Sequence, residues 1–409
     1  MKKINVVIVG GGFGGVYTAR HLAKLFKEDE IQITLINKTN YFLFTPLLHE
    51  VATGALTPDS IVEPIREVFR HGPIKFVEDV VTEVDTEGKV VKTAAQSFAY
   101  DYLVLSMGAE TNYFGTPGAQ ENSFTLKHLG DAIALRNHFV KTFEEAMETK
   151  NKDLLSLAIV GAGATGVELA AEAVEYFKDT MCAYYRNSGI THRDVKVTLV
   201  TATPDLIPIF PPKMREIAEK ELMRKGVSIM KNAKVVKVDP HMISFEGGTS
   251  LKAHTIVWVA GVKATTSDIK GTETGIKTTD KRRLEINDFL QSNTRPEIFS
   301  LGDVSGTSPM LAQVAVRQGK VVARNIRAHA DGATGELSKW SFNQKILLIS
   351  LGQWYAAGHF FGVTLRGFPM WWLWRTVYLF NFISLRKKVE IALEWTINLF
   401  YPRDITIIE

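Results

Sequence analysis

Two glycine-rich segments have the residue types and the spacing of dinucleotide-binding loops. They are Gly10-x-Gly12-x-x-Gly15 and Gly161-x-Gly163-x-x-Gly166. Glycine lets a phosphate approach the backbone closely, and the free N–H groups of a following helix then bind its negative charge. Each segment is therefore a candidate site for the pyrophosphate of a dinucleotide. The alternative, for each segment taken alone, is an ordinary glycine-rich turn.

The residues around each loop predict the strand, helix and second strand of a βαβ unit. Apolar residues 6–9 precede the first loop, a helix-like segment follows it, and residues 31–36 supply the second strand. Residues 157–160 and 195–200 flank the second loop in the same way. Two such units indicate two dinucleotides, and the economical pairing is FAD with NAD(P)H. The predicted fold class is therefore α/β, with two Rossmann-like dinucleotide-binding domains.

A third segment assigns the flavin to the first unit. Residues 297–303 form a strand pattern that ends in Gly302-Asp303, and a helix containing Ala312 and Gln313 follows. In flavoproteins with two dinucleotide-binding domains, such a Gly-Asp pair contacts the ribityl and pyrophosphate portion of FAD. The helix after it points its N-terminus at the flavin ring. Strand-like segments that end at Gly108 and Gly261 return the chain from one domain to the other.

The composition excludes several other functions. With 48 Lys and Arg against 44 Asp and Glu, the net charge of +4 is too small to indicate nucleic-acid binding. The single cysteine, Cys182, excludes internal disulfides, a Cys-x-x-Cys redox pair and a cysteine-built metal site, and we expect it to be inert. No metal site is predicted, since no ligand spacing links His49 and His128, which we interpret as satisfied structural histidines.

The N-terminal apolar stretch is too short for a signal peptide. It leads directly into Gly10-Gly11-Gly12, without a small-residue cleavage site. No uninterrupted apolar stretch reaches the roughly 20 residues that a membrane-spanning helix needs. The longest candidate, residues 371–385, is broken by Arg375. We therefore expect the body of the protein to lie in the cytosol.

The composition changes from Gly367 onward. Aromatic residues at helical spacing are Trp371, Trp374, Tyr378 and Phe382. After Arg386-Lys387-Lys388, a second helix pattern follows with a narrow polar stripe. Tryptophan-rich amphipathic helices flanked by Lys and Arg are typical of proteins that lie in the membrane interface. The alternatives are that these helices form a dimer core or cover the flavin domain. Membrane contact and a dimer core are compatible with each other, because a dimer can present a shared apolar face to the membrane.

From residue 4 to residue 404, the chain resembles the type II NADH dehydrogenases, which are single-subunit, non-pumping NADH:quinone oxidoreductases. The resemblance depends on residues 41–48 (YFLFTPLL), Gly166-Val167-Glu168, residues 258–262 (WVAGV), Ala312-Gln313 and the aromatic tail. It implies FAD as a non-covalent cofactor, NADH as hydride donor and a membrane quinone, ubiquinone or menaquinone, as acceptor. It also implies a place in the respiratory chain.

The resemblance also implies a set of cofactor-binding residues. On the FAD side they are Gly10, Gly12, Phe13, Gly14 and Gly15 at the pyrophosphate, Asn37 and Lys38 near the ribose, Val81 by the adenine, Thr45 and Pro46 under the flavin ring, Gly302 and Asp303 at the ribityl and pyrophosphate portion, Ala312 and Gln313 at the quinone side, and Gly108 at the end of its strand-to-glycine segment. On the NADH side they are Gly161, Gly163, Gly166, Thr201 and Gly261.

Three residues become catalytic candidates through the resemblance: Glu168, Gln313 and Lys345. A carboxylate at Glu168, desolvated between nicotinamide and flavin, would orient the donor or relay protons. The alternative is a first-turn glutamate that stabilises its helix N-terminus. Gln313 contacts the flavin or quinone, or is a plain polar residue at a helix start. Lys345 falls where the family places a lysine close to the flavin.

Four positions depart from the family pattern. Asn37 and Thr201 stand at the two strand ends where an acid commonly binds the ribose. Without a carboxylate at Thr201 the preference between NADH and NADPH stays open, although no nearby arginine offers a partner for the 2′-phosphate of NADPH. Arg317 lies four residues after Gln313, on the same helix face, so it is either a contact to the reduced flavin or quinone, or a solvated or phosphate-facing arginine. Ile346 replaces a glycine that is common after the lysine.

Together these observations predict an FAD domain of residues 1–115 and 280–330, an NADH domain of residues 116–279 and a membrane-anchoring amphipathic segment of residues 331–409. The predicted enzyme is a dimer on the cytoplasmic face of the membrane, bound peripherally, that passes a hydride from NADH to FAD and two electrons to quinone. The alternatives are a soluble NAD(P)H-dependent flavoprotein reductase of another acceptor and an NADH-sensing interaction module.

Overall fold

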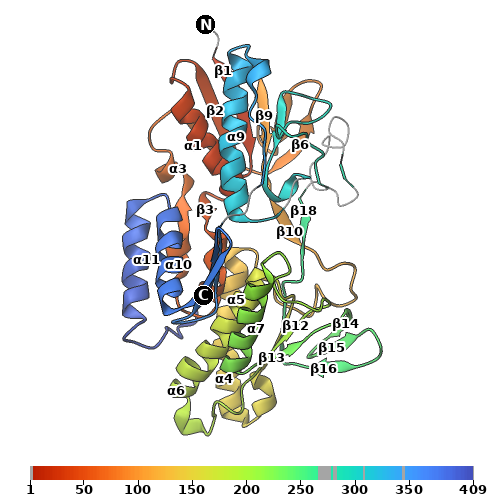
Figure 1. Ribbon diagram of the computed structural model, residues 1–409, viewed down its shortest axis with the longest axis vertical. Coiled ribbons are helices and arrows are strands. Elements are labelled where there is room, and N and C mark those ends of the chain that lie inside the picture. Colours follow the sequence, from red (N-terminus) through yellow and green to blue (C-terminus); the bar gives the residue numbers. More distant parts are fainter. Residues whose placement is uncertain (1–2, 266–277, 280–282, 307–308, 343–345, 409) are drawn as a thin grey trace. The chain divides into compact units, whose positions relative to one another are not determined.

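The computed structural model describes residues 3–265, 278–279, 283–306, 309–342 and 346–408. The chain divides into two compact units (Figure 1). The first unit consists of Met1–Leu43, Val62–Glu110 and Val262–Asn343, and the second of Phe44–Ile61, Thr111–Gly261 and Gln344–Glu409. The predicted mixed α/β class is confirmed, because each unit is built on its own parallel sheet.

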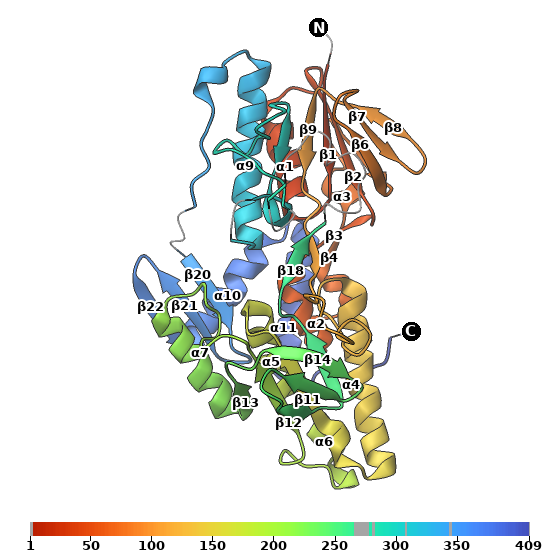
Figure 2. The same ribbon diagram turned by 90° about the vertical axis from the view of Figure 1, so that its right-hand side faces the viewer.

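The first unit contains a parallel five-stranded sheet in the order β19-β9-β1-β2-β5. Its strands are β1 (Ile4–Val9), β2 (Ile31–Asn37), β5 (Ile74–Glu78), β9 (Tyr102–Leu105) and β19 (Ile298–Ser300). These strands are almost continuously apolar, because layers cover both faces of the sheet. Helices α1 (Phe13–Leu25) and α9 (Ala312–Ala330) cover one face (Figure 2). The antiparallel strands β6 (Val81–Asp85), β7 (Val90–Thr93) and β8 (Ser97–Ala99) cover the other.

Small residues allow α1 and α9 to approach each other closely. A Cβ added at Gly319 of α9 would lie 3.0 Å from both the backbone nitrogen and the hydroxyl of Thr18. The Thr18 hydroxyl is itself buried and donates to the Gly14 carbonyl. The helix that follows the first glycine loop is therefore held directly against α9. Short elements complete this unit: β3 (Tyr41–Leu43), β4 (Val62–Pro64), α3 (Ile65–Val68) and β18 (Val262–Ala264).

The second unit contains a parallel four-stranded sheet in the order β13-β12-β11-β17. Its strands are β11 (Ser156–Val160), β12 (Lys196–Val200), β13 (Val227–Met230) and β17 (Thr255–Trp258). The helices of this part are α2 (Leu48–Ala52), α4 (Leu129–Thr149), α5 (Ala164–Glu175), α6 (Cys182–Tyr184) and α7 (Pro212–Lys225). An antiparallel sheet of β14 (Val235–Asp239), β15 (Met242–Phe245) and β16 (Ser250–Lys252) follows, and β10 (Ala109–Thr111) is the strand by which the chain enters the unit.

The C-terminal part of the chain belongs to the second unit. It forms the antiparallel strands β20 (Ile346–Ser350), β21 (Ala356–Phe360) and β22 (Val363–Gly367), then helices α10 (Phe368–Asn381) and α11 (Leu385–Ile397). Helix α10 begins after Gly367, with a proline in its first turn, and α11 begins where the Ser384 side chain accepts a hydrogen bond from the Lys387 backbone. Among the described residues, no helix is long and apolar enough to cross a membrane.

The units differ from the predicted domains in three places. Residues 44–61 belong to the second unit, the later boundary falls at 261/262 instead of 279/280, and residues from 344 onward pack with the second unit. Aromatic packing explains the first and last differences, because the Phe44 ring stacks on Phe382 at 4.2 Å and contacts Tyr378 at 6.1 Å. Both partners lie far along the chain, so local sequence patterns do not reveal them.

Candidate functional site

The first glycine loop needs glycine at two positions for its shape and leaves a third open. Gly10 has a φ of +101°, and a Cβ there would lie 2.5 Å from the Ser106 carbonyl oxygen. A Cβ at Gly15 would overlap the Gly10 carbonyl oxygen. At Gly12, by contrast, an added Cβ meets no atom within 4 Å. Backbone at an open position before a helix is what a pyrophosphate group needs for close approach.

The second loop repeats this arrangement. Gly161 has a φ of +116°, and a Cβ there would lie 2.5 Å from backbone atoms of Ala260. A Cβ at Gly166 would overlap the Gly161 carbonyl oxygen, whereas Gly163 again has nothing within 4 Å. In both loops the N-cap residue is a glycine, Gly12 or Gly163, so no side chain of that residue caps the first N–H groups of the helix. The residues present therefore fit one dinucleotide pyrophosphate in each unit.

Asn37 shapes the first loop through its side chain. Its Oδ1 accepts a hydrogen bond of 2.8 Å from the Gly11 backbone, and its Nδ2 donates to the Thr39 carbonyl at 2.9 Å. The next residue, Lys38, is exposed and lies 3.5 Å from Glu110, while Val81 is buried at the start of β6. An amide at this strand end both accepts and donates, which a carboxylate would not do.

Next to the first glycine loop, where a Cβ added at Gly14 would lie 3.2 Å from the Leu301 side chain, α9 is tied to the strand that precedes it. Gly302 has a φ of +74°, and its backbone N–H donates to Oε1 of Gln318 at 2.8 Å. Gln318 is fully buried and belongs to none of the motifs from which the site was predicted. A glutamine inside an otherwise apolar helix face was the available signal. Asp303 follows Gly302 in a single helical turn, and Ala312 and Gln313 form the first turn of α9.

The remaining predicted residues lie in several places. Thr45 and Pro46 form a helical turn in the second unit, Gly261 packs against the Phe114 ring, and Gly108 has a φ of +74° in the first unit. Thr201 is buried, with its hydroxyl 2.9 Å from that of Thr203. Arg317 is exposed on α9, and His128 caps α4. Cys182 is a buried free thiol, and burial raises its pKa to about 11. The predicted Lys345 lies outside the described residues.

Glu168 is buried inside the second unit. Helix α5 has no acidic residue in its first turn, so the interpretation of Glu168 as a first-turn helix-stabilising glutamate is wrong. Its side chain is 6% exposed; Oε1 accepts a hydrogen bond of 3.1 Å from the Ser350 backbone. Burial raises the pKa of this carboxyl to about 8, opposed by the Ser350 N–H and reinforced by Glu50 and Glu172. A carboxyl with such a pKa both gives and takes a proton near neutral pH.

His49 lies beside Glu168, with its Nδ1 4.0 Å from Oε2 of the carboxyl. It is buried, and its Nε2 has no hydrogen-bond partner in the part of the chain that the structure describes. The prediction that His49 is a structural histidine with both ring nitrogens hydrogen-bonded is therefore wrong for Nε2. Burial lowers its pKa to about 4, so the imidazole is neutral at pH 7. A His-Glu pair inside the apolar run of residues 47–52 was the sequence signal.

Further charged side chains surround Glu168 in what we call the buried acidic cluster. Its carboxyl groups are Glu50, Glu168, Glu172 and Glu175, and its cations are Lys225, Arg375 and Arg403. The Trp395 indole donates to Glu50 at 2.6 Å, and the Arg375 guanidinium lies 3.9 Å from the Trp371 ring centre. The hydrogen bond between Trp395 and Glu50 attaches α11 to α2, and Arg375 of α10 lies 4.9 Å from the Trp395 ring centre. The aromatic helices and the Glu168 carboxyl therefore share one packed region.

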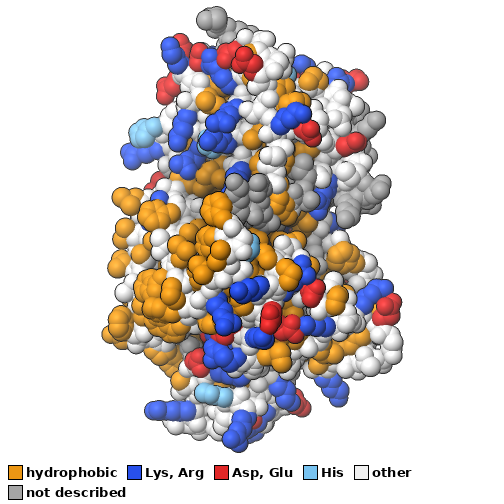
Figure 3. Space-filling model, in the orientation of Figure 1, with side chains coloured by type: hydrophobic (Ala, Val, Ile, Leu, Met, Phe, Trp, Pro, Cys, Tyr) orange, Lys and Arg blue, Asp and Glu red, His pale blue; other side chains and the backbone are white. Residues whose placement is uncertain are grey.

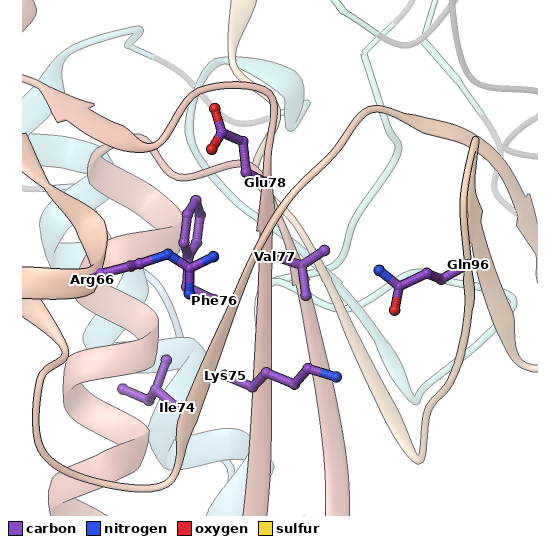
Figure 4. A pocket seen from close by; sticks show the side chains of 7 residues that line it. All are labelled: Arg66, Ile74, Lys75, Phe76, Val77, Glu78 and Gln96. Atoms are coloured by element: carbon purple, nitrogen blue, oxygen red, sulfur yellow. The ribbon is translucent and has the colours of Figure 1, made fainter.

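A surface cavity of about 590 Å³ lies elsewhere, along the outer edge of β5 in the first unit. Figure 4 shows Arg66 beside Phe76, with a guanidinium-to-ring distance of 5.1 Å, and Gln96 pointing across toward Val77. None of the predicted site residues lines this cavity. It is therefore separate from the glycine loop of the same unit.

Comparison with known proteins gives consistent matches. Residues 4–319 match the family model described as pyridine nucleotide-disulphide oxidoreductase. The type II NADH:quinone oxidoreductase of Mycobacterium tuberculosis is 30% identical, with 98% of this chain and 89% of that protein covered. The one from Staphylococcus saprophyticus is 30% identical over 88% of this chain and 91% of its own. Among solved structures, NDH2 from Plasmodium falciparum in complex with NADH has a TM-score of 0.88 at 19% identity, covering 99% of this chain and 100% of that one.

Proposed function

Because the chain belongs to the family of type II NADH:quinone oxidoreductases, we propose that it oxidises NADH and reduces a membrane quinone without pumping protons. When bound, FAD would accept a hydride from NADH and return two electrons to the quinone. The observation that carries this proposal is the pair of glycine loops, each with one open glycine before a helix N-terminus. The first loop would hold FAD and the second NADH.

The chain's own residues would position the two dinucleotides. Gly12 and Gly163 leave room for the phosphates, and Asn37 holds the Gly11 backbone in place. On the NADH side, Thr201 offers a neutral hydroxyl where a carboxylate would repel the 2′-phosphate of NADPH. Gln313 at the start of α9, together with Lys345, would contact the flavin or the quinone.

Glu168 would hold a proton for quinone reduction, which consumes two protons. Two observations support this proton-donor role. Burial raises the pKa of the Glu168 carboxyl to about 8, and the hydrogen bond from the Ser350 N–H holds the carboxyl in position. A donor of this kind is active in its protonated form. Turnover would therefore fall as the pH rises through about 8.

The apolar surface of the second unit supports peripheral membrane contact, and we propose the cytoplasmic face as the side that is contacted. Its large exposed residues are Trp354, Phe361, Val363, Leu365, Phe368, Trp372, Leu373, Phe380, Leu385, Val389, Leu393, Ile397, Phe400 and Tyr401. Figure 3 shows hydrophobic side chains gathered over α10, α11 and the β20–β22 strands. Contiguous apolar surface of this kind marks an interaction site. A bilayer that contains the quinone would cover it, and a homodimer would present two such surfaces.

The test follows the flavin spectrum of the purified protein during addition of NADH and then of a short-chain quinone. We expect rapid bleaching by NADH and quinone-dependent recovery. Bleaching without recovery would indicate a reductase of another acceptor or an NADH-sensing module, and the absence of a flavin spectrum would refute the proposal.

Glu168→Gln tests the proton role separately. The variant should bleach normally with NADH, lose at least about a hundredfold in quinone reduction and lose the decline in rate near pH 8. Glu148→Gln is the matched control, since Glu148 is exposed on α4. An unchanged pH profile in Glu168→Gln would show that this carboxyl donates no proton.

A further inference from the structure

A second surface cavity, of about 340 Å³, lies between α7 and β22 in the second unit. Its lining residues are Lys213, Glu216, Ile217, Lys220, Thr364 and Arg366. Three of these six side chains are cations and one is a carboxylate, so the cavity has a net positive charge. None of them has a part in the function proposed above.

The positive charge in this cavity is only partly neutralised. Lys220 pairs with Glu216 at 2.5 Å, whereas Lys213 and Arg366 make no ion pair with any residue that the structure describes. Lys220, and then Arg366 and Lys213, hold the pKa of Glu216 below its usual range. All three cations therefore act on the same small volume. Two exposed cations, Lys213 and Arg366, remain for an anionic ligand.

Strand β22 separates this cavity from the apolar surface. Successive side chains of a strand point to opposite faces. Thr364 and Arg366 line the cavity, so Val363 and Leu365 lie on the other face, where they are 58% and 50% exposed. The adjoining turn exposes Phe361 by 72%. One short strand thus presents Thr364 and the cation Arg366 on one side and apolar side chains on the other, while Lys213 and Lys220 reach the cavity from α7.

We propose that this cavity binds the phosphate headgroup of an anionic phospholipid whose acyl chains lie against the apolar face of β22. The proposal rests on the membrane contact proposed above and adds the lipid class that the contact prefers. Lys and Arg bind phosphate through charge-assisted hydrogen bonds. The apolar residues beside the cavity favour a lipid over a soluble phosphate ester, since they match the acyl chains.

The test is binding of the full-length, flavin-loaded protein to vesicles of phosphatidylcholine alone or with added phosphatidylglycerol. The variant is the double substitution Lys213→Gln and Arg366→Gln, which leaves the Lys220–Glu216 pair intact. The control is Arg193→Gln with Lys196→Gln, two exposed cations elsewhere in the second unit. It removes the same charge from a surface away from β22.

We expect wild type and control to prefer the anionic vesicles, and the cavity variant to lose this preference. A cation near a charged bilayer contributes roughly fivefold in binding, so the two substitutions together should reduce binding roughly 25-fold. Binding to neutral vesicles should not change. In wild type and control, the preference should weaken with added salt.

Several results would overturn the headgroup site. Equal losses in cavity variant and control would show a diffuse charge effect, and equal binding of wild type to both vesicle types would leave the membrane contact standing without a headgroup site. Wild type that binds neither vesicle would refute the membrane contact itself. If the cavity variant loses binding of inorganic phosphate but keeps the vesicle preference of wild type, the cavity belongs to a soluble anion. A changed oligomeric state in the variant would assign it to a second copy of the chain.

Discussion

Arg403 lies at the centre of the buried acidic cluster, and its removal should destabilise the second unit in a pH-dependent way. Its Nη2 lies 2.6 Å from Glu172 and 3.8 Å from Glu175, and its Nη1 donates to the Thr53 hydroxyl at 3.1 Å. Burial would raise the pKa of Glu172, but Arg403 outweighs it, so the folded pKa lies below the usual value. Arg403→Met keeps most of the volume and removes the charge.

The size of the effect follows from the proton that Glu172 must then take up. A buried glutamate without a partner reaches a pKa of about 8 to 9. Glutamate in the unfolded chain has a pKa of about 4.3, and each pH unit above that pKa adds about 1.4 kcal/mol to the free energy of protonating it. Protonation of Glu172 on folding at pH 7 therefore costs about 3.7 kcal/mol. At pH 5.5 the same reasoning gives about 1.6 kcal/mol. The variant's folded state binds the extra proton, so its deficit grows as the pH rises.

Urea denaturation followed by tryptophan fluorescence at pH 5.5 and pH 7 measures both values. The double variant Arg403→Met with Glu172→Gln is the control, because it removes both charges and should recover most of the lost stability. A loss below about 0.5 kcal/mol at pH 7, the range of ordinary surface substitutions, would refute the reasoning. A loss of equal size at both pH values would also refute it.

The remaining predictions concern the NADH side. Gly163→Ala should raise the Kd for NADH roughly tenfold with an unchanged Tm, because its Cβ meets no protein atom but occupies the phosphate's approach. Its matched control, Gly166→Ala, should lower the Tm, since that Cβ overlaps the Gly161 carbonyl oxygen. A fluorescence titration measures the Kd, and a melting curve measures the Tm. A lower Tm in Gly163→Ala, or an unchanged Tm in Gly166→Ala, would contradict the loop assignment. Thr201→Glu should increase the ratio of kcat/KM for NADH over NADPH by roughly tenfold, and an unchanged ratio in steady-state assays would show that this strand end does not face the ribose.

The parallel sheets could be predicted from the sequence because their signals are local. The predicted strands 6–9, 31–36, 157–160 and 195–200 coincide with β1, β2, β11 and β12 to within two residues at either end. Residues 6–9 and 157–160 are short, buried apolar runs followed by glycine, and residues 31–36 and 195–200 are mostly buried β-branched and apolar residues with one exposed polar residue each, Gln32 and Lys196. The two glycine loops follow from the same local pattern.

The surroundings of the candidate site could not be predicted in this way. Glu168 was identified through the family resemblance, but its contacts with Ser350 and His49 join segments more than 100 residues apart. Periodicity shows which face of an element is apolar and leaves open which other element covers it. For the same reason the interpretation of His49 as a satisfied histidine failed at Nε2, and Gln318 was missed.

The contact between Thr53 and Arg403 joins positions 350 residues apart, which has a consequence for synthesis. Ribosomes add about 5 to 20 residues per second, so roughly 20 to 70 seconds separate the two residues during translation. Until Arg403 emerges, Glu172 lacks the cation that holds its pKa low, and the Thr53 hydroxyl at the end of α2 lacks the guanidinium that donates to it. The nascent second unit must therefore keep the Glu172 carboxyl hydrated or protonated throughout that interval, and its packing around this group is completed only once Arg403 has been added.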